Sequence, residues 1–165
     1  MPDWNQILDD FGPVVWKQAM RMLGNESDAA DCFQSVMIEA FQLSQRQQVR
    51  SWPGLLKRLA TLRAIDSLRA RYRHSAETLS HENIQQLQVS RKQTKASDEQ
   101  ELADELRREL SLLPKEQAEA FSLKVIQEMS TKAVAEQMGI TSNHVGVLVH
   151  RARTTIRKRL RRNEE

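Results

Sequence analysis

Residues 130–153 (STKAVAEQMGITSNHVGVLVHRAR) constrain the fold more than any other segment of this chain. Ser130 can cap a short helix that ends at Met138. Gly139 can then form a turn, and Thr141 can cap the next helix. Apolar residues occupy the positions that a helix-turn-helix must bury: Val134, Met138, Ile140, Val145 and Leu148. The segment therefore predicts a helix-turn-helix rather than two helices packed in some other way.

The rest of the chain also has helical periodicity. Only 5% of its 165 residues are aromatic, and no long run alternates between apolar and polar residues. We expect an all-α fold with two small helical domains, at 1–73 and 98–165, the second containing the helix-turn-helix. Residues 74–97 are rich in Gln, Ser and charge, which is typical of a flexible linker. The second domain should begin with a helix at 98–110 and continue with one from Pro114, which buries Ala118, Phe121, Leu123 and Val125.

Glycine, proline and capping residues set the expected helix limits in the first domain. Gly12-Pro13 should break the first helix, Gly24 should end the next, and Ser27 should cap a third. This third helix should bury an apolar stripe: Ala30, Phe33, Val36, Met37, Ala40 and Phe41. A loop at 43–54 and a helix at 55–73 should follow.

Basic residues gather in two blocks. Residues 46–73 hold 8 basic and 1 acidic side chains, and residues 151–165 hold 7 basic and 2 acidic ones, whereas the net charge of the chain is only +3. Two basic blocks separated by acidic or neutral sequence suggest two contacts with a polyanion. Two solvated helix faces are the alternative explanation of the charge pattern.

Catalysis and secretion find little support in the sequence. Cys32 is the single cysteine, which excludes an internal disulfide and a cysteine-based zinc site and fits a reducing cytoplasm. No apolar stretch approaches the roughly 20 residues of a membrane span, and no signal peptide is evident, so no membrane insertion is expected. Asp28, Asp31 and Asp66 have the spacing of helix caps and surface pairs, and neither a phosphate loop nor a metal-ligand spacing occurs. We expect no catalytic residue, no metal and no cofactor, and hence a protein that is not an enzyme.

The second helix of a helix-turn-helix enters the major groove of duplex DNA with its N-terminal residues leading. Its outward candidates here are Ser142, Asn143, His144, Val147 and His150. An Asn can pair with adenine, and a small apolar side chain can meet a thymine methyl group. Basic residues that suit phosphates follow, namely Arg151, Arg153, Arg157, Lys158 and Arg159. The histidines can equally be ordinary exposed residues, and Val147 can belong to the core.

Trp52 lies in the expected loop, near Arg46 and Arg50. Its ring could stack on an unpaired base while the arginines hold phosphates. The alternative, and the commoner case, is a tryptophan that closes the loop against the core. Tyr72, which stands among arginines, is similarly ambiguous.

Three segments, in this order and at this separation, resemble the extracytoplasmic-function (ECF) sigma factors, the promoter-specificity subunits of bacterial RNA polymerase. SDAADCFQSVMIEAF is similar to the polymerase-docking helix, through Asp28, Asp31, Gln34 and Phe41. RSWPGLLKRLATLRAIDSLRARYR is similar to the segment that reads and opens the downstream promoter element, through Leu59-Ala60, Ala64-Ile65-Asp66 and Leu68-Arg69. LSLLPKEQAEAFSLKV and the helix-turn-helix resemble the upstream-element domain, through Leu113-Pro114, Ala135, Gly139, Val145 and Arg151-Ala152-Arg153.

The resemblance implies three groups of site residues. Binding to the polymerase clamp is assigned to Asp28, Asp31, Gln34, Ser35, Ile38 and Gln42. Binding to the melted downstream element is assigned to Arg46, Arg50, Ser51, Trp52, Lys57, Arg58, Arg63, Arg69 and Tyr72. Binding to the duplex upstream element is assigned to Ser142, Asn143, His144, Gly146, Val147, His150, Arg151 and Arg153.

The sequence departs from the family's pattern within these groups. Ser35 replaces an acidic residue, and Trp52, Leu55 and Leu62 replace the usual Phe, Trp and Asn. Gly146, Val147 and Leu148 stand where basic and polar residues are usual. A glycine inside a helix costs about 0.5–1 kcal/mol relative to alanine, and the missing cations remove phosphate contacts.

The resemblance implies a cytoplasmic sigma factor that binds core RNA polymerase and promoter DNA, both duplex and single-stranded, and directs promoter-specific transcription initiation. Melting of the downstream element then needs only preferential binding of the unpaired strand. An anti-sigma factor would be a further partner. Two other classes compete with this prediction: an autonomous helix-turn-helix regulator that binds duplex DNA without polymerase, and a helical adaptor that binds only proteins.

Overall fold

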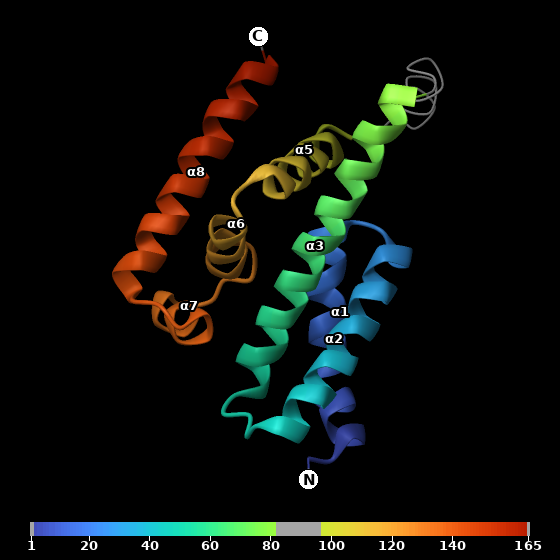
Figure 1. Ribbon diagram of the computed structural model, residues 1–165, viewed down its shortest axis with the longest axis vertical. Coiled ribbons are helices and arrows are strands. Elements are labelled where there is room, and N and C mark those ends of the chain that lie inside the picture. Colours follow the sequence, from blue (N-terminus) through green and yellow to red (C-terminus); the bar gives the residue numbers. More distant parts are fainter. Residues whose placement is uncertain (1, 82–96, 165) are drawn as a thin grey trace.

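The computed structural model describes residues 2–81 and 97–164, and helices joined by short turns make up this part of the chain (Figure 1). In chain order the helices are α1 (Trp4–Leu23), α2 (Glu26–Arg46), α3 (Trp52–His81), α5 (Asp98–Leu112), α6 (Lys115–Phe121), α7 (Thr131–Met138) and α8 (Ser142–Glu164), with a π-helical turn at Ser122–Ile126. The predicted all-α fold is confirmed. None of the described helices is both long enough and apolar enough to cross a membrane.

Helix α3 lies at the centre of the arrangement (Figure 1). It packs against α1 and α2, and we call these three helices the N-terminal bundle. It also packs against α5, α6 and α7, which together with α8 form the C-terminal bundle. The buried apolar side chains form one cluster that includes Val15 in α1, Leu68 in α3 and Ile156 in α8. The two bundles are therefore packed on each other through α3.

Helix α1 continues through Gly12 and Pro13, so the predicted break at these residues is wrong. Pro13 has no backbone N–H and removes one hydrogen bond of the helix, but the residue is exposed. Ile7 and Val15, on either side of it, are both buried, and this packing outweighs the single missing hydrogen bond. As predicted, Gly24 ends the helix, in the left-handed conformation with a φ of 76°.

Helix α2 is capped by Asn25, so the cap predicted at Ser27 is wrong by two residues. The Asn25 side chain accepts a hydrogen bond from the backbone N–H of Asp28 at 2.8 Å. The buried residues of α2 are Ala29, Cys32, Val36 and Ala40. Val36 and Ala40 of the predicted stripe are thus confirmed, but the buried face is rotated from the predicted one, since Phe33 and Met37 are only half-buried, and Ala30 and Phe41 are exposed. Small side chains let α2 approach α3 closely, which leaves the larger ones at the edge of the contact.

Cys32 illustrates the close contact between α2 and α3. Its thiol is buried and donates a weak hydrogen bond to the backbone carbonyl of Ala60, at 3.7 Å. Burial raises the pKa of the Cys32 thiol to about 11, although the charge of Arg63 acts in the opposite direction. The cysteine is therefore a core residue.

The connection between α2 and α3 is shorter than predicted. It spans 47–51 rather than 43–54, and α3 (Trp52–His81) extends beyond both limits of the predicted 55–73 helix. Residues 82–96 of the predicted linker lie outside the described residues.

Two residues explain the early start of α3. The Ser51 hydroxyl accepts a hydrogen bond from the backbone N–H of Gly54 at 3.2 Å and so caps the helix. Pro53 fits the first turn, where a helix requires no backbone donor. The core residues of this helix include Leu56, Leu59, Ile65 and Leu68.

The predicted helix-turn-helix is present as α7 and α8. The hydroxyls of Ser130 and Thr141 each accept a hydrogen bond, at 3.1 Å, from the backbone N–H three residues further on. Gly139 ends α7 with a φ of 68°. Val134, Val145 and Leu148 are buried, and Met138 and Ile140 are half-buried. The local sequence signals thus predicted the limits of α7, the turn after it and the start of α8.

The two helices before this motif need smaller corrections. Helix α5 ends at Leu112 rather than at 110, and α6 follows Pro114 as predicted. Ala118, Phe121 and Leu123 are buried, but Val125 is 38% exposed and is not a core residue. The π-helical turn at Ser122–Ile126 shifts the register that a regular helix would keep, which explains this error.

Candidate nucleic-acid interface

The surface of α2 that was predicted to bind polymerase is open to solvent. Asp31, Gln34, Ser35, Ile38 and Gln42 are all exposed, and we call these five residues the α2 face. Ile38 is 58% exposed. An apolar side chain surrounded by polar ones is the arrangement found at the centre and rim of protein interfaces. The geometry of the α2 face therefore suits a protein partner.

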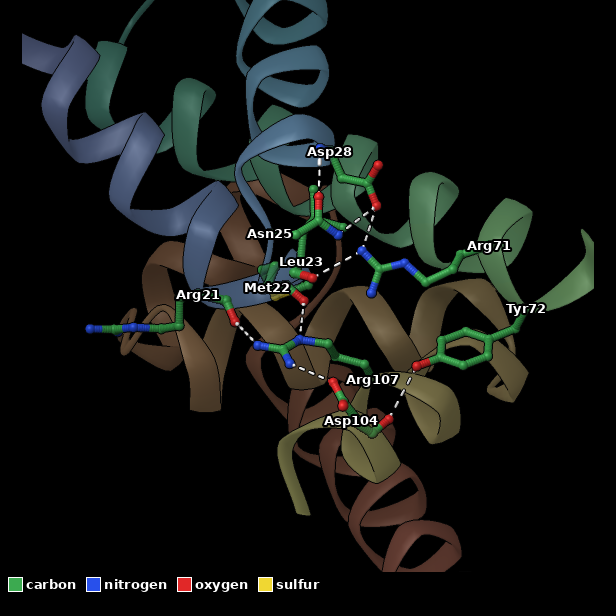
Figure 2. Close-up of polar contacts among 9 residues, drawn as sticks. All are labelled: Arg21, Met22, Leu23, Asn25, Asp28, Arg71, Tyr72, Asp104 and Arg107. Carbon is green, nitrogen blue, oxygen red and sulfur yellow. Dashed lines mark hydrogen bonds and ion pairs between the residues drawn. The ribbon is translucent and has the colours of Figure 1, made fainter. Parts of the chain in front are cut away.

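Asp28 differs from the rest of the predicted polymerase site because its carboxylate has partners within the chain. It accepts hydrogen bonds from the guanidinium group of Arg71 in α3 and from Asn25 Nδ2, the latter at 3.1 Å (Figure 2). Arg71 above all, together with Asn25, holds the pKa of Asp28 below its usual value. Asp28 thus ties the start of α2 to α3.

The predicted downstream-element residues fall into exposed and packed groups. Arg46, Arg50 and Ser51, at or near the 47–51 turn, are exposed. Trp52 is half-buried, and its ring meets that of Trp4 edge-on with 5.4 Å between the ring centroids. Trp4 in turn meets Phe41 at 5.2 Å, so one aromatic cluster joins α1, α2 and α3. This cluster supports the alternative in which Trp52 closes the turn against the core.

Further along α3, Arg63 has two acidic partners inside the N-terminal bundle. Arg63 Nε lies 3.2 Å from Glu39 Oε2, and Arg63 Nη1 lies 3.2 Å from Asp66 Oδ2. Lys57 is half-buried. These residues are therefore less accessible than the sequence suggested.

Three other predicted downstream-element residues of α3 bind the C-terminal bundle. The contacts are Arg58 with the Glu119 carboxylate, Arg69 with the Leu113 carbonyl, and Tyr72 with the Asp104 carbonyl, at 3.0, 2.8 and 3.2 Å. Glu119 is only 6% exposed, so the carboxylate of this ion pair lies largely out of water, whereas the Arg58 side chain is 36% exposed. The structure therefore brings the basic helix against the second half of the chain rather than against solvent.

The start of α8 presents its predicted upstream-element residues to solvent. Ser142, Asn143, His144, Gly146, Val147, His150, Arg151 and Arg153 are all exposed. Val147 is 37% exposed, which argues against a core role. A Cβ on Gly146 would meet no other atom within 4 Å, so a larger side chain fits there. This surface has the geometry that a recognition helix requires.

The sequence interpretation missed part of the basic surface of α8. Thr154, Arg157, Lys158, Arg161 and Arg162 line a shallow hollow on this helix. Only Arg157 and Lys158 were singled out from the sequence. The signal was present, because the five positions recur with the period of a helix and hence share one face.

Two family matches cover most of the chain. Residues 7–74 match Sigma-70 region 2, and residues 103–162 match Sigma-70, region 4. The chain is 27% identical over 157 residues to the ECF RNA polymerase sigma factor SigE of Mycolicibacterium smegmatis, an alignment that covers 95% of this chain and 61% of that protein. It is 28% identical over 163 residues to the ECF RNA polymerase sigma factor SigW of Bacillus subtilis, covering 94% of this chain and 87% of that one.

A solved structure has the same fold. The sigma factor RpoE from Bartonella quintana, in complex with the anti-sigma factor NepR, superposes with a TM-score of 0.57 at 18% identity over 98% of both chains. Region 2 followed by region 4, in two packed helical bundles, defines a protein of the sigma-70 class. Within that class, the chain belongs to the extracytoplasmic-function sigma factors. Membership of this family agrees with the prediction that the chain is not an enzyme.

Proposed function

We propose that this chain binds core RNA polymerase and directs promoter-specific transcription initiation. The observation that carries the proposal is the presence, in one chain, of the exposed α2 face and of a capped helix-turn-helix whose recognition residues are exposed. The names of SigE and SigW, both RNA polymerase sigma factors, support the same function. The solved relative was captured with an anti-sigma factor, and a partner of that kind is proposed for this chain as well.

The proposed roles divide between the bundles. The α2 face docks on the polymerase clamp, and the start of α8 reads the upstream element as duplex DNA. Arg46, Arg50 and the basic residues of α3 bind the downstream element. Their preference for the unpaired strand would favour the open promoter without any chemical step.

Run-off transcription with purified core polymerase on a library of the host's promoters tests this function. We expect transcripts from a restricted set of promoters, and only when the chain is added. An autonomous regulator would instead bind the same promoters as duplex DNA without polymerase. Equal affinity of the free chain and of its complex with polymerase for these promoters would therefore favour the autonomous regulator.

A further inference from the structure

We propose that the C-terminal half of α8 is a binding site for an oligophosphate, an anion with several consecutive phosphate groups, and that an oligophosphate bound there weakens DNA binding by the start of the same helix. The phosphate chain can be that of an inorganic polyphosphate or of a nucleoside polyphosphate, since the site recognises the phosphates. The effect on DNA rests on the proposed function, because it takes the start of α8 (Ser142–Glu164) as a recognition helix.

The site is the shallow hollow near the end of this helix, which we call the α8 hollow. Its lining consists of four cationic side chains and one hydroxyl group, without a carboxylate: Thr154, Arg157, Lys158, Arg161 and Arg162. All five residues are exposed. Figure 1 shows α8 along one edge of the molecule, so a ligand can reach this surface from solvent. The hollow therefore offers hydrogen-bond donors and positive charge to a ligand.

The cations of the α8 hollow differ from the arginines at the helix contacts, which already have acceptors. Arg63 in α3 and Arg107 in α5 have carboxylate partners at 3.2 and 3.0 Å. Arg159, on another side of α8, pairs with Glu109 at 3.1 Å. No described residue forms a hydrogen bond or an ion pair with the guanidinium and ammonium groups of the hollow. An anion that binds there therefore displaces no partner within the described chain.

The spacing of these cations explains why an anion with several phosphate groups fits. Arg161 follows Arg157 by four positions and Lys158 by three, so these side chains are neighbours on the helix and repel each other. Arginine can bind two phosphate oxygens at once, and lysine adds a point charge. A single phosphate gains little at an exposed surface, because water and salt screen the attraction. Linked phosphates contact several cations at once and relieve their repulsion.

The α8 hollow lies on the same side of the helix as the predicted recognition residues, but further along it. Asn143, His150 and Arg157 are separated by seven positions each, which is close to two helical turns, so they share one face. The helix enters the major groove with its N-terminal residues, and the groove is about 12 Å wide. Arg157 lies about 21 Å beyond Asn143 along the helix axis. The hollow therefore lies outside the groove that the start of α8 enters, and its cations remain available to another anion.

The two sites on α8 are close enough to affect each other. Arg153, a predicted upstream-element residue, precedes Arg157 by about 6 Å along the helix axis. This distance is shorter than the Debye length, which is about 8 Å at physiological ionic strength. An oligophosphate in the α8 hollow therefore lowers the positive potential that attracts DNA phosphates to Arg153. By linkage, bound DNA weakens oligophosphate binding by the same factor.

Binding of three phosphate probes to the full-length chain tests the site. The probes are orthophosphate, inorganic triphosphate and ATP, all at equal ionic strength and without a divalent metal, and isothermal titration calorimetry measures their dissociation constants. Arg161→Gln with Arg162→Gln, the hollow variant, removes two exposed cations of the α8 hollow. Lys17→Gln with Arg108→Gln is the matched control, because it removes the same charge at exposed positions of α1 and α5.

We expect the wild-type chain to bind triphosphate about tenfold more tightly than orthophosphate, and the hollow variant to lose about tenfold in triphosphate affinity. The control variant should lose less than about twofold, because its cations lie outside the hollow. Equal affinity for triphosphate and ATP means that the phosphate chain alone is recognised, whereas tighter binding of ATP points to a nucleoside polyphosphate; both results support the site. Equal losses in the two variants, or no preference over orthophosphate, mean non-specific attraction and overturn it. If the hollow variant unfolds in a thermal melt, Lys158→Gln takes its place.

Fluorescence anisotropy with a labelled duplex of randomised sequence tests the effect on DNA. Saturating triphosphate should weaken duplex binding by the wild-type chain about threefold and should hardly affect the hollow variant. Orthophosphate at the same ionic strength is the control and should change neither. The salt dependence of duplex affinity should be the same in the hollow and control variants. A slope that is smaller by about two counterions in the hollow variant would mean that Arg161 and Arg162 bind the duplex itself, which overturns a separate site.

These outcomes are separable from failure of the proposed function. Run-off transcription by the wild-type chain and core polymerase tests the function, and it needs no added triphosphate. Promoter-specific transcription by a chain that does not bind triphosphate at the α8 hollow would overturn the oligophosphate site alone. Triphosphate binding that the hollow variant loses, in a chain without promoter-specific transcription, would support the site and overturn the proposed function.

Discussion

The α2 face and the basic surface of α3 belong to one bundle, yet the first is open and much of the second is covered. The α2 face consists of one carboxylate, neutral polar groups and an isoleucine, and all five side chains are exposed. The α3 surface is rich in arginines, and three of them have partners within the chain: Arg58 and Arg69 through hydrogen bonds, and Arg63 through ion pairs. Charge composition therefore shows what a surface can bind but not whether that surface is available.

The largest expected effect concerns the open side of this comparison. Asp31→Arg combined with Gln34→Ala should weaken binding to core polymerase by about a thousandfold, roughly 4 kcal/mol, if the α2 face is the centre of the docking surface. The melting temperature should hardly change, because both side chains are exposed. Co-purification and circular dichroism measure the two effects.

The matched control for this variant is Asp9→Arg with Gln6→Ala, which makes the same changes at exposed positions of α1. Retained polymerase binding by the α2 variant would remove the α2 face from the interface. Equal loss in both variants would point to net charge rather than to a specific surface.

Trp52→Ala tests whether Trp52, which lies between the exposed 47–51 turn and the packed part of α3, stabilises the fold or stacks on DNA. The loss of its edge contact with Trp4 should lower the free energy of unfolding by about 3 kcal/mol. Urea titration measures this value. A stable variant with a loss of about 1–3 kcal/mol in single-strand binding would instead make Trp52 a stacking residue.

The start of α8 extends the comparison to the C-terminal bundle, where the predicted DNA surface is open. Asn143→Ala or His150→Ala should change the preferred upstream sequence, at about 1–3 kcal/mol for each lost base contact. Selection of the full-length chain on a randomised duplex library measures this preference, with Lys132→Ala in α7 as the control. Unchanged preferences would mean that α8 recognises DNA shape and phosphates alone.

A smaller gain is expected at Gly146, which lies in open space on the same helix. Gly146→Lys should raise duplex affinity across all sequences and steepen the salt dependence by about one counterion. It should also stabilise α8 by about 0.5–1 kcal/mol, because glycine is a poor helix former. Asn5→Lys, which adds the same charge on α1, should change neither the duplex affinity of α8 nor the stability of that helix. A sequence-specific gain would contradict the phosphate assignment.

The smallest effect is expected at Asp28, which joins α2 to α3. Because its pKa in the folded state is lowered from 3.8, the interaction with Arg71 stabilises the fold above about pH 4 and is lost as the pH falls through the lowered value. Asp28→Asn should therefore reduce the melting temperature slightly at neutral pH and flatten its decline in acid. Thermal melts at several pH values measure this difference, with Asp9→Asn as the control. Parallel curves for wild type and Asp28→Asn would contradict it.

Sequence reasoning succeeded where the signal is local. The caps at Ser130 and Thr141 and the turn at Gly139 depend on residues within one helical turn, and the structure places all three as predicted. It failed where distant packing decides. Pro13 should have broken α1, but core residues on both sides of it hold the helix together.

The accessibility of the predicted DNA-binding residues could not be predicted from the sequence for the same reason, because contacts between distant residues decide it. Arg58 and Glu119 are 61 positions apart, and no local pattern links them. The stripe on α2 was partly misplaced because aromatic residues were expected inside, whereas the close contact with α3 also selects small ones such as Ala29 and Cys32. Exposure of the α2 face, by contrast, could be predicted from its polar composition alone.

The single thiol of the described chain has a practical consequence. Burial raises the pKa of Cys32 to about 11, so the thiol is almost entirely protonated at pH 8 in the folded state, and the sulfur is also shielded by α3. Alkylating reagents should therefore react with it mainly when α2 and α3 come apart. The rate of Cys32 alkylation therefore measures how often the N-terminal bundle opens locally, and this rate can be compared between the free and the polymerase-bound chain without adding a second cysteine.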